Sequence, residues 1–549
     1  MLTDKPYYMI SYFARQKSFY LIITLIVCTN FPAFSQLSKQ EKIAVETQAS
    51  DYFRNGQYHL ALPLYLELDS IYKDSKYDYP VGVCYINDFD NTAALPYFLK
   101  CLQTPLEFPA RLYFYTAKAY HLSHNMDEAI KYYELYKSKL KPKKDVQLIE
   151  KIDREIEMCN NGKELMAYPL KIKIKNMGGV INSSYPDYAP VLSADQQTII
   201  FTSNRPNTTG GNVDESDGLY YEDIYISNKD TGGNWSAPQK ISDNINSNGH
   251  DASISLTADG QKLIFYRYLK ENVLFASSGD LYISELHGNE WDEPLKFPEQ
   301  INTSGWEPSA CFSEDERTLY FSSNREGGFG GTDIWKVKKL PNGSWALPQN
   351  MGKAINTPYD EDSPFIHPDG KTLYFSSMGH KTMGGYDVFS SQYNDTLKQW
   401  SNARNIGYPI STAHDDIHFT WSADANTVFF SSYRENEGYG GKDIFSAEIQ
   451  KEAAFVYVMK GIVFDSINHH PIEATIRVID GDTNEIVGIF NSNSSTGKYI
   501  IILPEGKNYT FSVAAPNYGL CSEMINIANL RQYKEVSRDI SLCPTHHVK

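Results

Sequence analysis

Acidic residues recur at fixed positions in the middle of this chain. The sequence aligns on five isoleucines, and an acid stands six residues after each one. The isoleucines are Ile181, Ile245, Ile301, Ile355 and Ile410, and the acids are Asp187, Asp251, Glu307, Glu361 and Asp416. Carboxylates in groups can bind metal ions or act as general acids and bases. A fold-building role, however, is needed in every copy, whereas an active site is needed once. We therefore expect these acids to accept backbone N–H groups at turns and strand ends.

Two further aspartates repeat with the same alignment. One stands fourteen residues after the isoleucine, and the other closes each copy before an aliphatic and an aromatic residue. They are Asp195, Asp259, Asp315, Asp369 and Asp424, and Asp223, Asp280, Asp333, Asp387 and Asp443. The same reasoning predicts a structural role for both sets.

Three arginines recur at a single offset: Arg205, Arg325 and Arg434. If they shared one rim, they would form a ring that receives carboxylates or peptide C-termini of a partner. The alternative is that each arginine pairs with the acid of its own copy. The pairs His250-Asp251 and His414-Asp415 are the nearest approach to a His–acid site, but a hydrogen-bonded turn histidine is the favoured interpretation.

The usual catalytic motifs are missing from the sequence. We find no G-x-S-x-G, no H-E-x-x-H, no Walker A motif and no Cys–His arrangement at metal spacing. The six cysteines after residue 35 are scattered. The sequence therefore predicts no catalytic residue, no metal site and no cofactor, with the three arginines as candidate partner-binding residues.

The elements that position these residues are short strands. In the fourth copy, T-L-Y-F-S-S (Thr372–Ser377) is β-branched and aromatic, and a Pro-Asp-Gly turn precedes it. A repeat of 54–64 residues with several short strands is typical of a β-propeller blade. Five blades are visible, and six remain open if one is degenerate. Tyr168–Lys175 is expected to supply the outer strand of the last blade and close the ring.

Residues 40–165 have helical periodicity instead. Ala49, Gly82 and Ala117 are each followed three residues later by tyrosine, and their spacings of 33 and 35 residues bracket the tetratricopeptide period. Asn160–Gly162 is expected to be a linker. After Ile449, short strands with turns between them predict a small β-sandwich.

The N-terminus has the order of an export signal. Arg15 and Lys17 precede an apolar run, and small residues precede Gln36, so cleavage after Ser35 is expected. Lipidation at Cys28 is the alternative. The formal charge of −16 argues against nucleic acid or anionic lipid as the main partner. No later stretch is long and apolar enough to predict a transmembrane span.

Several motifs now point to known families. The copies with P-D-G-x-x-L-Y-F and G-G-x-D resemble WD40-like repeats of the TolB type. The block G-I-V-F-D (461–465), H-P-I-E-A (470–474) and T-G-K-Y (496–499) resembles a carboxypeptidase regulatory-like, transthyretin-type domain. In this order, the parts are similar to multidomain OmpA-family cell-envelope proteins of Bacteroidetes, one branch of which is linked to type IX secretion and gliding. The family's C-terminal OmpA-like domain has no counterpart, so peptidoglycan anchoring is not implied.

The predicted organisation is a signal peptide (1–35), an all-α tetratricopeptide solenoid (36–162), a β-propeller (163–452) and a transthyretin-like β-sandwich (453–545). The resemblance implies an exported, non-enzymatic scaffold in the periplasm or at the outer membrane. Its partners would be envelope or secretion-system proteins. The alternative is a propeller that binds or hydrolyses a glycan or peptide at its central channel. Tyr-rich, charged loops at the ring centre would favour this alternative, and a channel plugged by side chains would favour the scaffold.

Overall fold

A computed structural model describes residues 38–545 of the chain, apart from 88–90, 215–216, 270–278, 423–425, 435–436, 450–455, 505–506 and 529–533. The predicted signal peptide (1–35), with Cys28, lies outside the described residues, as does Asp424.

Seven α-helices form the N-terminal part of the described chain. They are α2 (Lys39–Arg54), α3 (Tyr58–Tyr72), α4 (Asp78–Asn87), α5 (Asn91–Gln103), α6 (Arg111–Leu122), α7 (Met126–Lys137) and α8 (Val146–Ala167). Consecutive helices pack on each other, and small residues such as Ala49, Ala61, Ala117 and Ala129 are fully buried where they meet. None of the described helices combines the length and the apolar character needed to cross a membrane.

Helix α8 contradicts the predicted linker. It runs without a break through Asn160–Gly162, and both Asn161 and Gly162 are buried. Asn161 donates a hydrogen bond from its side chain to the Thr382 carbonyl at 2.9 Å, and Arg154 donates to the Met378 carbonyl at 2.9 Å. Loops of the following sheets therefore supply hydrogen-bond partners for both side chains.

Five antiparallel sheets follow the helices. Their strands are β2 (Asp187–Leu192), β3 (Thr198–Ser203), β4 (Asp223–Asn228) and β5 (Gln239–Lys240); β6 (His250–Leu256), β7 (Lys262–Tyr268), β8 (Asp280–His287), β9 (Glu290–Trp291) and β10 (Leu295–Lys296); β11 (Ala310–Phe312), β12 (Thr318–Ser323), β13 (Asp333–Lys338) and β14 (Gln349–Asn350); β15 (Glu361–Ile366), β16 (Thr372–Ser377), β17 (Asp387–Asn394), β18 (Gln399–Trp400) and β19 (Arg404–Asn405); and β1 (Ile174–Asn176), β20 (Asp416–Trp421), β21 (Thr427–Ser432) and β22 (Asp443–Glu448).

The five sheets close into a propeller-like ring. The innermost strands β2, β6, β11, β15 and β20 contact one another in this order, and β20 contacts β2 again. β1 pairs antiparallel with β22, with Ile174 opposite Ala447, so a strand from before the first sheet completes the last one. The predicted pairing with the last sheet is confirmed, but the strand expected at Tyr168–Lys175 is shorter and begins only at Ile174. Fully buried phenylalanines on the second strands fill the spaces between sheets: Phe201, Phe265, Phe321, Phe375 and Phe430.

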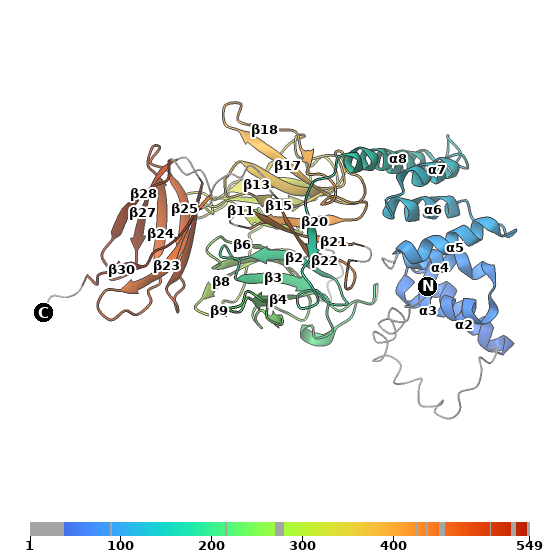
Figure 1. The fold of residues 1–549 in the computed structure, drawn as a ribbon, viewed down its shortest axis with the longest axis horizontal. Coiled ribbons are helices and arrows are strands. Elements are labelled where there is room, and N and C mark those ends of the chain that lie inside the picture. Colours follow the sequence, from blue (N-terminus) through green and yellow to red (C-terminus); the bar gives the residue numbers. More distant parts are fainter. Residues whose placement is uncertain are drawn as a thin grey trace, which may run out of the picture.

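A unit of two smaller sheets ends the described chain. Its strands are β23 (Val456–Asp465), β24 (Thr475–Asp480), β25 (Ile486–Asn491), β26 (Lys498–Pro504), β27 (Asn508–Ala514), β28 (Cys521–Asn526), β29 (Lys534–Ser537) and β30 (Ile540–Leu542). One sheet pairs β26, β23, β29 and β30, and the other has the order β25-β24-β27-β28. This unit and the helices lie on opposite sides of the ring (Figure 1).

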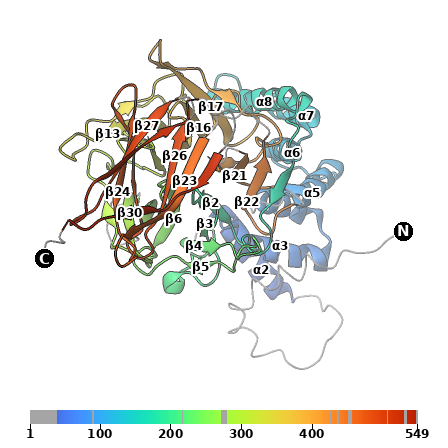
Figure 2. The ribbon, with the colours of Figure 1, turned by 60° about the vertical axis from the view of Figure 1, so that its left-hand side comes forward.

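The two-sheet unit packs directly on the ring. Val458 and Ile502 share a buried cluster with Phe419 and Trp421 of the last sheet. The Asn491 amide also donates to the Asp259 carboxylate at 2.9 Å. Figure 2 shows β23, β24 and β27 in front of the ring strands when this side is turned forward.

The predicted fold class therefore needs correction. The chain as described is mainly a set of small antiparallel sheets, and its helices are a short N-terminal part fixed to them by α8 rather than a tetratricopeptide solenoid. A residue period predicts that helices pair, but it carries no information on whether the stack stands alone.

Candidate functional site at the ring centre

The repeated acids lie at the start of the innermost strands and are fully buried. Ion pairs with the predicted arginines satisfy three of them. Arg205 Nη2 lies 2.6 Å from Asp187 Oδ1, Arg325 Nη2 lies 3.4 Å from Glu307 Oε1, and Arg434 Nη2 lies 3.5 Å from Asp416 Oδ1. The structure thus does not bring the three arginines together, and each is paired within its own sheet.

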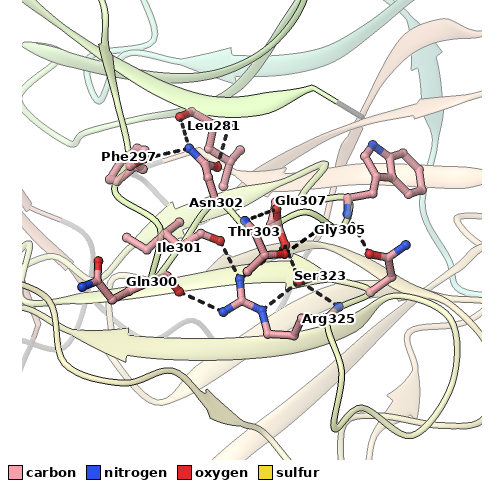
Figure 3. A network of polar contacts seen from close by, with 12 residues as sticks. Leu281, Phe297, Gln300, Ile301, Asn302, Thr303, Gly305, Glu307, Ser323 and Arg325 are labelled. Atoms are coloured by element: carbon pink, nitrogen blue, oxygen red, sulfur yellow. Dashed lines mark hydrogen bonds and ion pairs between the residues drawn. The ribbon is translucent and has the colours of Figure 1, made fainter. Parts of the chain in front are cut away.

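Figure 3 shows one of these networks in detail. Arg325 also donates to the backbone carbonyls of Gln300 and Ile301 and to the Ser323 hydroxyl. Glu307 accepts from the amide and hydroxyl of Thr303. With so many of its donors occupied inside the sheet, this guanidinium serves the fold.

The other two sheets lack an arginine at the aligned position, and a different residue lies close to that position in each. In the second sheet Arg267, two residues earlier in the repeat, bonds Asp251 through Nε at 2.6 Å. In the fourth sheet His380, one residue later in the repeat, donates from Nε2 to the Ile355 carbonyl, 2.8 Å away. Glu361 therefore has no arginine partner, and burial raises its pKa to about 7.

The closing aspartates also serve the fold, as predicted. Asp333 accepts from the Phe329 amide at 2.7 Å and from the Asn350 side chain at 2.6 Å. Asp387 accepts in the same way from the Met383 amide and from Asn405. Such bonds lock the glycine-rich loop onto the strand that follows it.

The two histidines of the predicted histidine–acid pairs lie in different surroundings. His414 lies where the helices meet the ring, its ring centroid 4.7 Å from that of Tyr433, and burial lowers its pKa to about 3. His250 instead contacts Glu222, a residue that sequence reasoning missed, and its ring lies 4.0 Å from that of Tyr221. His250 is therefore part of a cavity wall rather than a simple turn residue.

That cavity occupies the ring centre and has a volume of about 520 Å³. All five innermost strands contribute to its wall, and Ile489, Phe490 and Ile502 of the two-sheet unit complete it at one end. Aromatic side chains are frequent in the wall: Tyr188, Tyr266, Tyr268, Trp306, Phe419 and Trp421. The channel is therefore not filled by its own side chains.

The innermost strands carry a backbone irregularity where they face the cavity. Ala189, Ser363 and His418 have φ values of 51°, 51° and 55°, each eight residues after the aligned isoleucine, and β2, β15 and β20 shift register there. Residues other than glycine adopt this left-handed conformation at a cost, and such bulges often lie at binding sites. Their amides are held by hydroxyls of neighbouring sheets: Ala189 donates to Ser431, and Ser363 to Ser309, both at 2.9 Å.

Two carboxyl groups of the wall differ in their electrostatic surroundings. Burial raises the pKa of Glu222, but the hydrogen bond and charge of His250 outweigh this and leave it below its usual value. Burial raises the pKa of Asp362 above its usual value, because only uncharged donors (Ser309, Ser322 and the Ser363 amide) contact it.

Three polar atoms in the wall have no hydrogen-bond partner among the described residues: Ser363 Oγ, His418 Nδ1 and Glu314 Oε2. Burial and nearby acids raise the pKa of Glu314 to about 7, so this carboxyl group carries a proton for much of the time near neutrality. Buried polar groups are normally hydrogen-bonded. Atoms away from the cavity are in the same state, among them Asp333 Oδ1 and Asp387 Oδ1, so these three atoms are groups that a ligand could bond rather than evidence of one.

Comparisons with known proteins find similarity to solved structures only. No protein-family model and no curated protein matches the chain. Among solved structures, hydroxyquinol 1,2-dioxygenase from Pseudomonas putida is 11% identical, with a TM-score of 0.14, over 17% of this chain and 57% of that one. An α-L-arabinofuranosidase from Lactobacillus brevis is 14% identical, with a TM-score of 0.32, over 47% of this chain and 90% of that one. An α-L-arabinofuranosidase from Fusarium graminearum, in complex with an iminosugar inhibitor, is 10% identical, with a TM-score of 0.31, over 61% and 97%. This chain thus spans little more than half of the dioxygenase.

The prediction of a non-enzymatic scaffold, and with it the prediction that the chain is not an enzyme, is contradicted. The criterion for a scaffold was a channel plugged by side chains, and the channel instead holds a cavity lined by tyrosines, acids and histidines. The alternative interpretation, a ligand site in the central channel, agrees better with these findings.

Proposed function

We propose that this protein binds a saccharide in the cavity at the centre of its ring and acts on it there. The observation that carries the proposal is the cavity wall, where aromatic faces, carboxyl groups and polar atoms without partners occur together. Its volume of about 520 Å³ lies within the range of small-molecule sites.

The side chains of the wall suit a sugar. A sugar ring presents apolar C–H faces to aromatic side chains and hydroxyl groups at its edges to carboxylates, imidazoles and hydroxyls. Trp306, Tyr188 and Tyr266 supply the aromatic faces. Glu222, Asp362 and Ser363 supply acceptors and donors around them.

Hydrolysis is favoured by one further property of the wall, the pKa of Glu314, which burial and nearby acids raise to about 7. Glycoside hydrolysis needs a carboxylic acid that protonates the leaving oxygen and a carboxylate that acts as base or nucleophile. Environments that push two carboxyl pKa values apart are typical of such pairs. Glu314, in the turn after β11, has the raised pKa expected of the acid. Glu222 has the lowered pKa of a carboxylate but lies beside His250, at the opposite end of the innermost strands, so it does not form a catalytic pair with Glu314.

Saccharide binding is tested by isothermal calorimetry against a panel of oligosaccharides selected on a glycan array. Trp306 is 41% exposed and lines the cavity, so Trp306→Ala should keep the fold and weaken binding about tenfold or more. Phe329 is equally exposed but lies outside the wall, and Phe329→Ala should bind like the unchanged protein. Equal affinities in all three proteins, or no saccharide bound at all, would reject the proposal.

Hydrolysis is tested on the saccharide that binds, by release of reducing ends. Glu314→Gln keeps the size of the side chain but cannot donate the proton, so we expect release to fall by about 100-fold or more while binding persists. If the unchanged protein releases no reducing ends, the site binds without cleaving.

A further inference from the structure

The charged residues of the cavity wall are almost all of one sign. Asp214, Glu222, Asp259, Glu314, Glu316 and Asp362 lie in the wall, whereas none of its described residues is lysine or arginine. Lys262 pairs with Glu316, and His250 pairs with Glu222 and lies 3.9 Å from Asp214, so three of these acids have a countercharge from the protein. Lys442 pairs with Asp415 and acts on His418 only at a distance.

Asp362 contrasts with the acids one residue earlier in the repeat. Those acids meet an arginine in four of the five sheets. Asp362 Oδ1 accepts from the Ser322 and Ser309 hydroxyls and the Ser363 amide, all uncharged, and Oδ2 accepts from no described residue. A carboxylate in such a place gains most from a cation.

Ser363, which follows Asp362, also has a polar group without a hydrogen-bond partner among the described residues. Ser363 is only 7% exposed, has the strained left-handed backbone, and its hydroxyl has no partner among the described residues. The Ser363 hydroxyl and the Asp362 carboxylate, which has no countercharge, lie next to each other. Together they can bind one ligand substituent that carries a positive charge and several N–H donors.

We propose that the cavity selects a saccharide that carries a protonated amino group, with Asp362 as the countercharge of the ammonium and the Ser363 hydroxyl as its second acceptor. The inference rests on the proposed saccharide function and narrows it to amino sugars. Anionic sugars such as uronic acids are excluded by the same field, since like charges in a poorly solvated cavity repel.

The test compares three oligosaccharide probes by calorimetry on the full chain: glucosamine trimer, N-acetylglucosamine trimer and galacturonic acid trimer. The first two differ mainly in the charge of the amino group. A hydrogen-bonded ion pair should make the glucosamine trimer bind about 10- to 100-fold more tightly than the N-acetylated one. The galacturonic acid trimer should bind least.

Asp362→Asn should remove this preference without weakening the N-acetylated trimer, because asparagine keeps an oxygen for the serine hydroxyls. Asp395→Asn is the matched control, since Asp395 is 57% exposed on an outer loop and pairs with Lys371. The preference of the unchanged protein is itself decisive, so the test does not depend on the folding of the variant.

Each outcome separates the two proposals. Equal or tighter binding of the N-acetylated or anionic trimer overturns the amine inference and leaves saccharide binding intact. Binding of spermidine, a linear polyamine, with no binding of any trimer overturns the saccharide function, although the cation preference stands. A preference that persists in Asp362→Asn overturns the role given to Asp362. No binding of any probe overturns both proposals.

Discussion

At the scale of single residues, one acid of the repeat differs from its equivalents. Glu361 and Glu307 occupy the same position in neighbouring sheets and both accept from a threonine and a serine, but only Glu307 faces an arginine. Burial without a countercharge raises the pKa of Glu361 to about 7 from 4.5.

This difference predicts opposite pH behaviour of stability. Because the folded pKa of Glu361 lies above its unfolded value, the folded state binds the extra proton between pH 4.5 and 7, and stability falls as pH rises through that range. When the pH is raised from 5 to 8, the unfolding free energy of the unchanged protein should fall by about 2–3 kcal/mol more than that of Glu361→Gln. Urea unfolding at the two pH values measures this.

Glu307→Gln is the matched variant. It leaves Arg325 buried without its countercharge, so it should cost about 3–5 kcal/mol at both pH values. A pH dependence of Glu361→Gln that equals that of the unchanged protein would show that Glu361 is ionised in the folded state.

At the scale of elements, the Gly-Gly loops set the distance between neighbouring sheets. A Cβ atom on Gly384 would lie 2.3 Å from the backbone of Ala413 in the next sheet, and one on Gly330 would lie 2.3 Å from the backbone of Pro358. The Gly-Gly pairs thus stand where the backbones of two neighbouring sheets approach closely.

We therefore expect Gly384→Ala to push two sheets of the ring apart and to cost about 3 kcal/mol of unfolding free energy. Gly370→Ala is the control: it has a φ of 66° in a hairpin turn, with nothing within 4 Å of its added Cβ, so it should cost only about 1 kcal/mol of backbone strain. Thermal and urea unfolding compare them. Equal costs would mean that the loops can move apart without loss.

Sequence patterns predicted elements better than their contacts. The repeated isoleucines, phenylalanines and turn residues predicted the ring strands, and the closing strand β1 was placed by its position before the first copy. The linker at Asn160–Gly162 was wrong because Asn and Gly usually end helices, whereas here the Thr382 carbonyl accepts from Asn161. Local composition does not record such a tertiary partner.

The candidate site was harder to predict for the same reason. Arg267 forms the same kind of ion pair as the predicted arginines, but it lies two residues before their aligned position, so the alignment did not identify it. Glu222 and Asp362 have neither motif nor period, and they become a site only because ring closure brings distant strands together. The left-handed residues at one repeat offset leave no signal in residue type, since they are alanine, serine and histidine.

At the scale of the whole molecule, histidines are buried where the helices meet the ring. His121 bonds the Met383 carbonyl through Nε2 at 2.8 Å, and His124 accepts from the Ala413 amide at 3.4 Å. Burial, with His121 and Arg434 nearby, lowers the pKa of His124 from 6.5 to about 4. The contact between the two parts of the chain therefore depends on the neutral imidazole of His124.

This arrangement predicts that acid weakens the docking of the helices. Because the folded pKa of His124 is below its unfolded value, the unfolded chain binds the extra proton between pH 6.5 and 4, and stability falls as pH drops through this range. Asparagine tolerates the φ of 59° at this position, so His124→Asn should keep the turn after α6. From pH 7.5 to 5, the unchanged protein should lose about 2 kcal/mol more unfolding free energy than His124→Asn.

Calorimetric and urea unfolding of the full chain at both pH values provide the measurement, and comparison with the unchanged protein cancels the opposite contribution of the buried acids. The helices and ring should unfold together at pH 7.5, because α8 ties them through Arg154 and Asn161. Near pH 5 the helices should unfold before the ring, because the protonated imidazole of His124 leaves the apolar interface. If both proteins respond equally to pH, the interface admits water and protons while folded, and the helices are held by the α8 contacts alone.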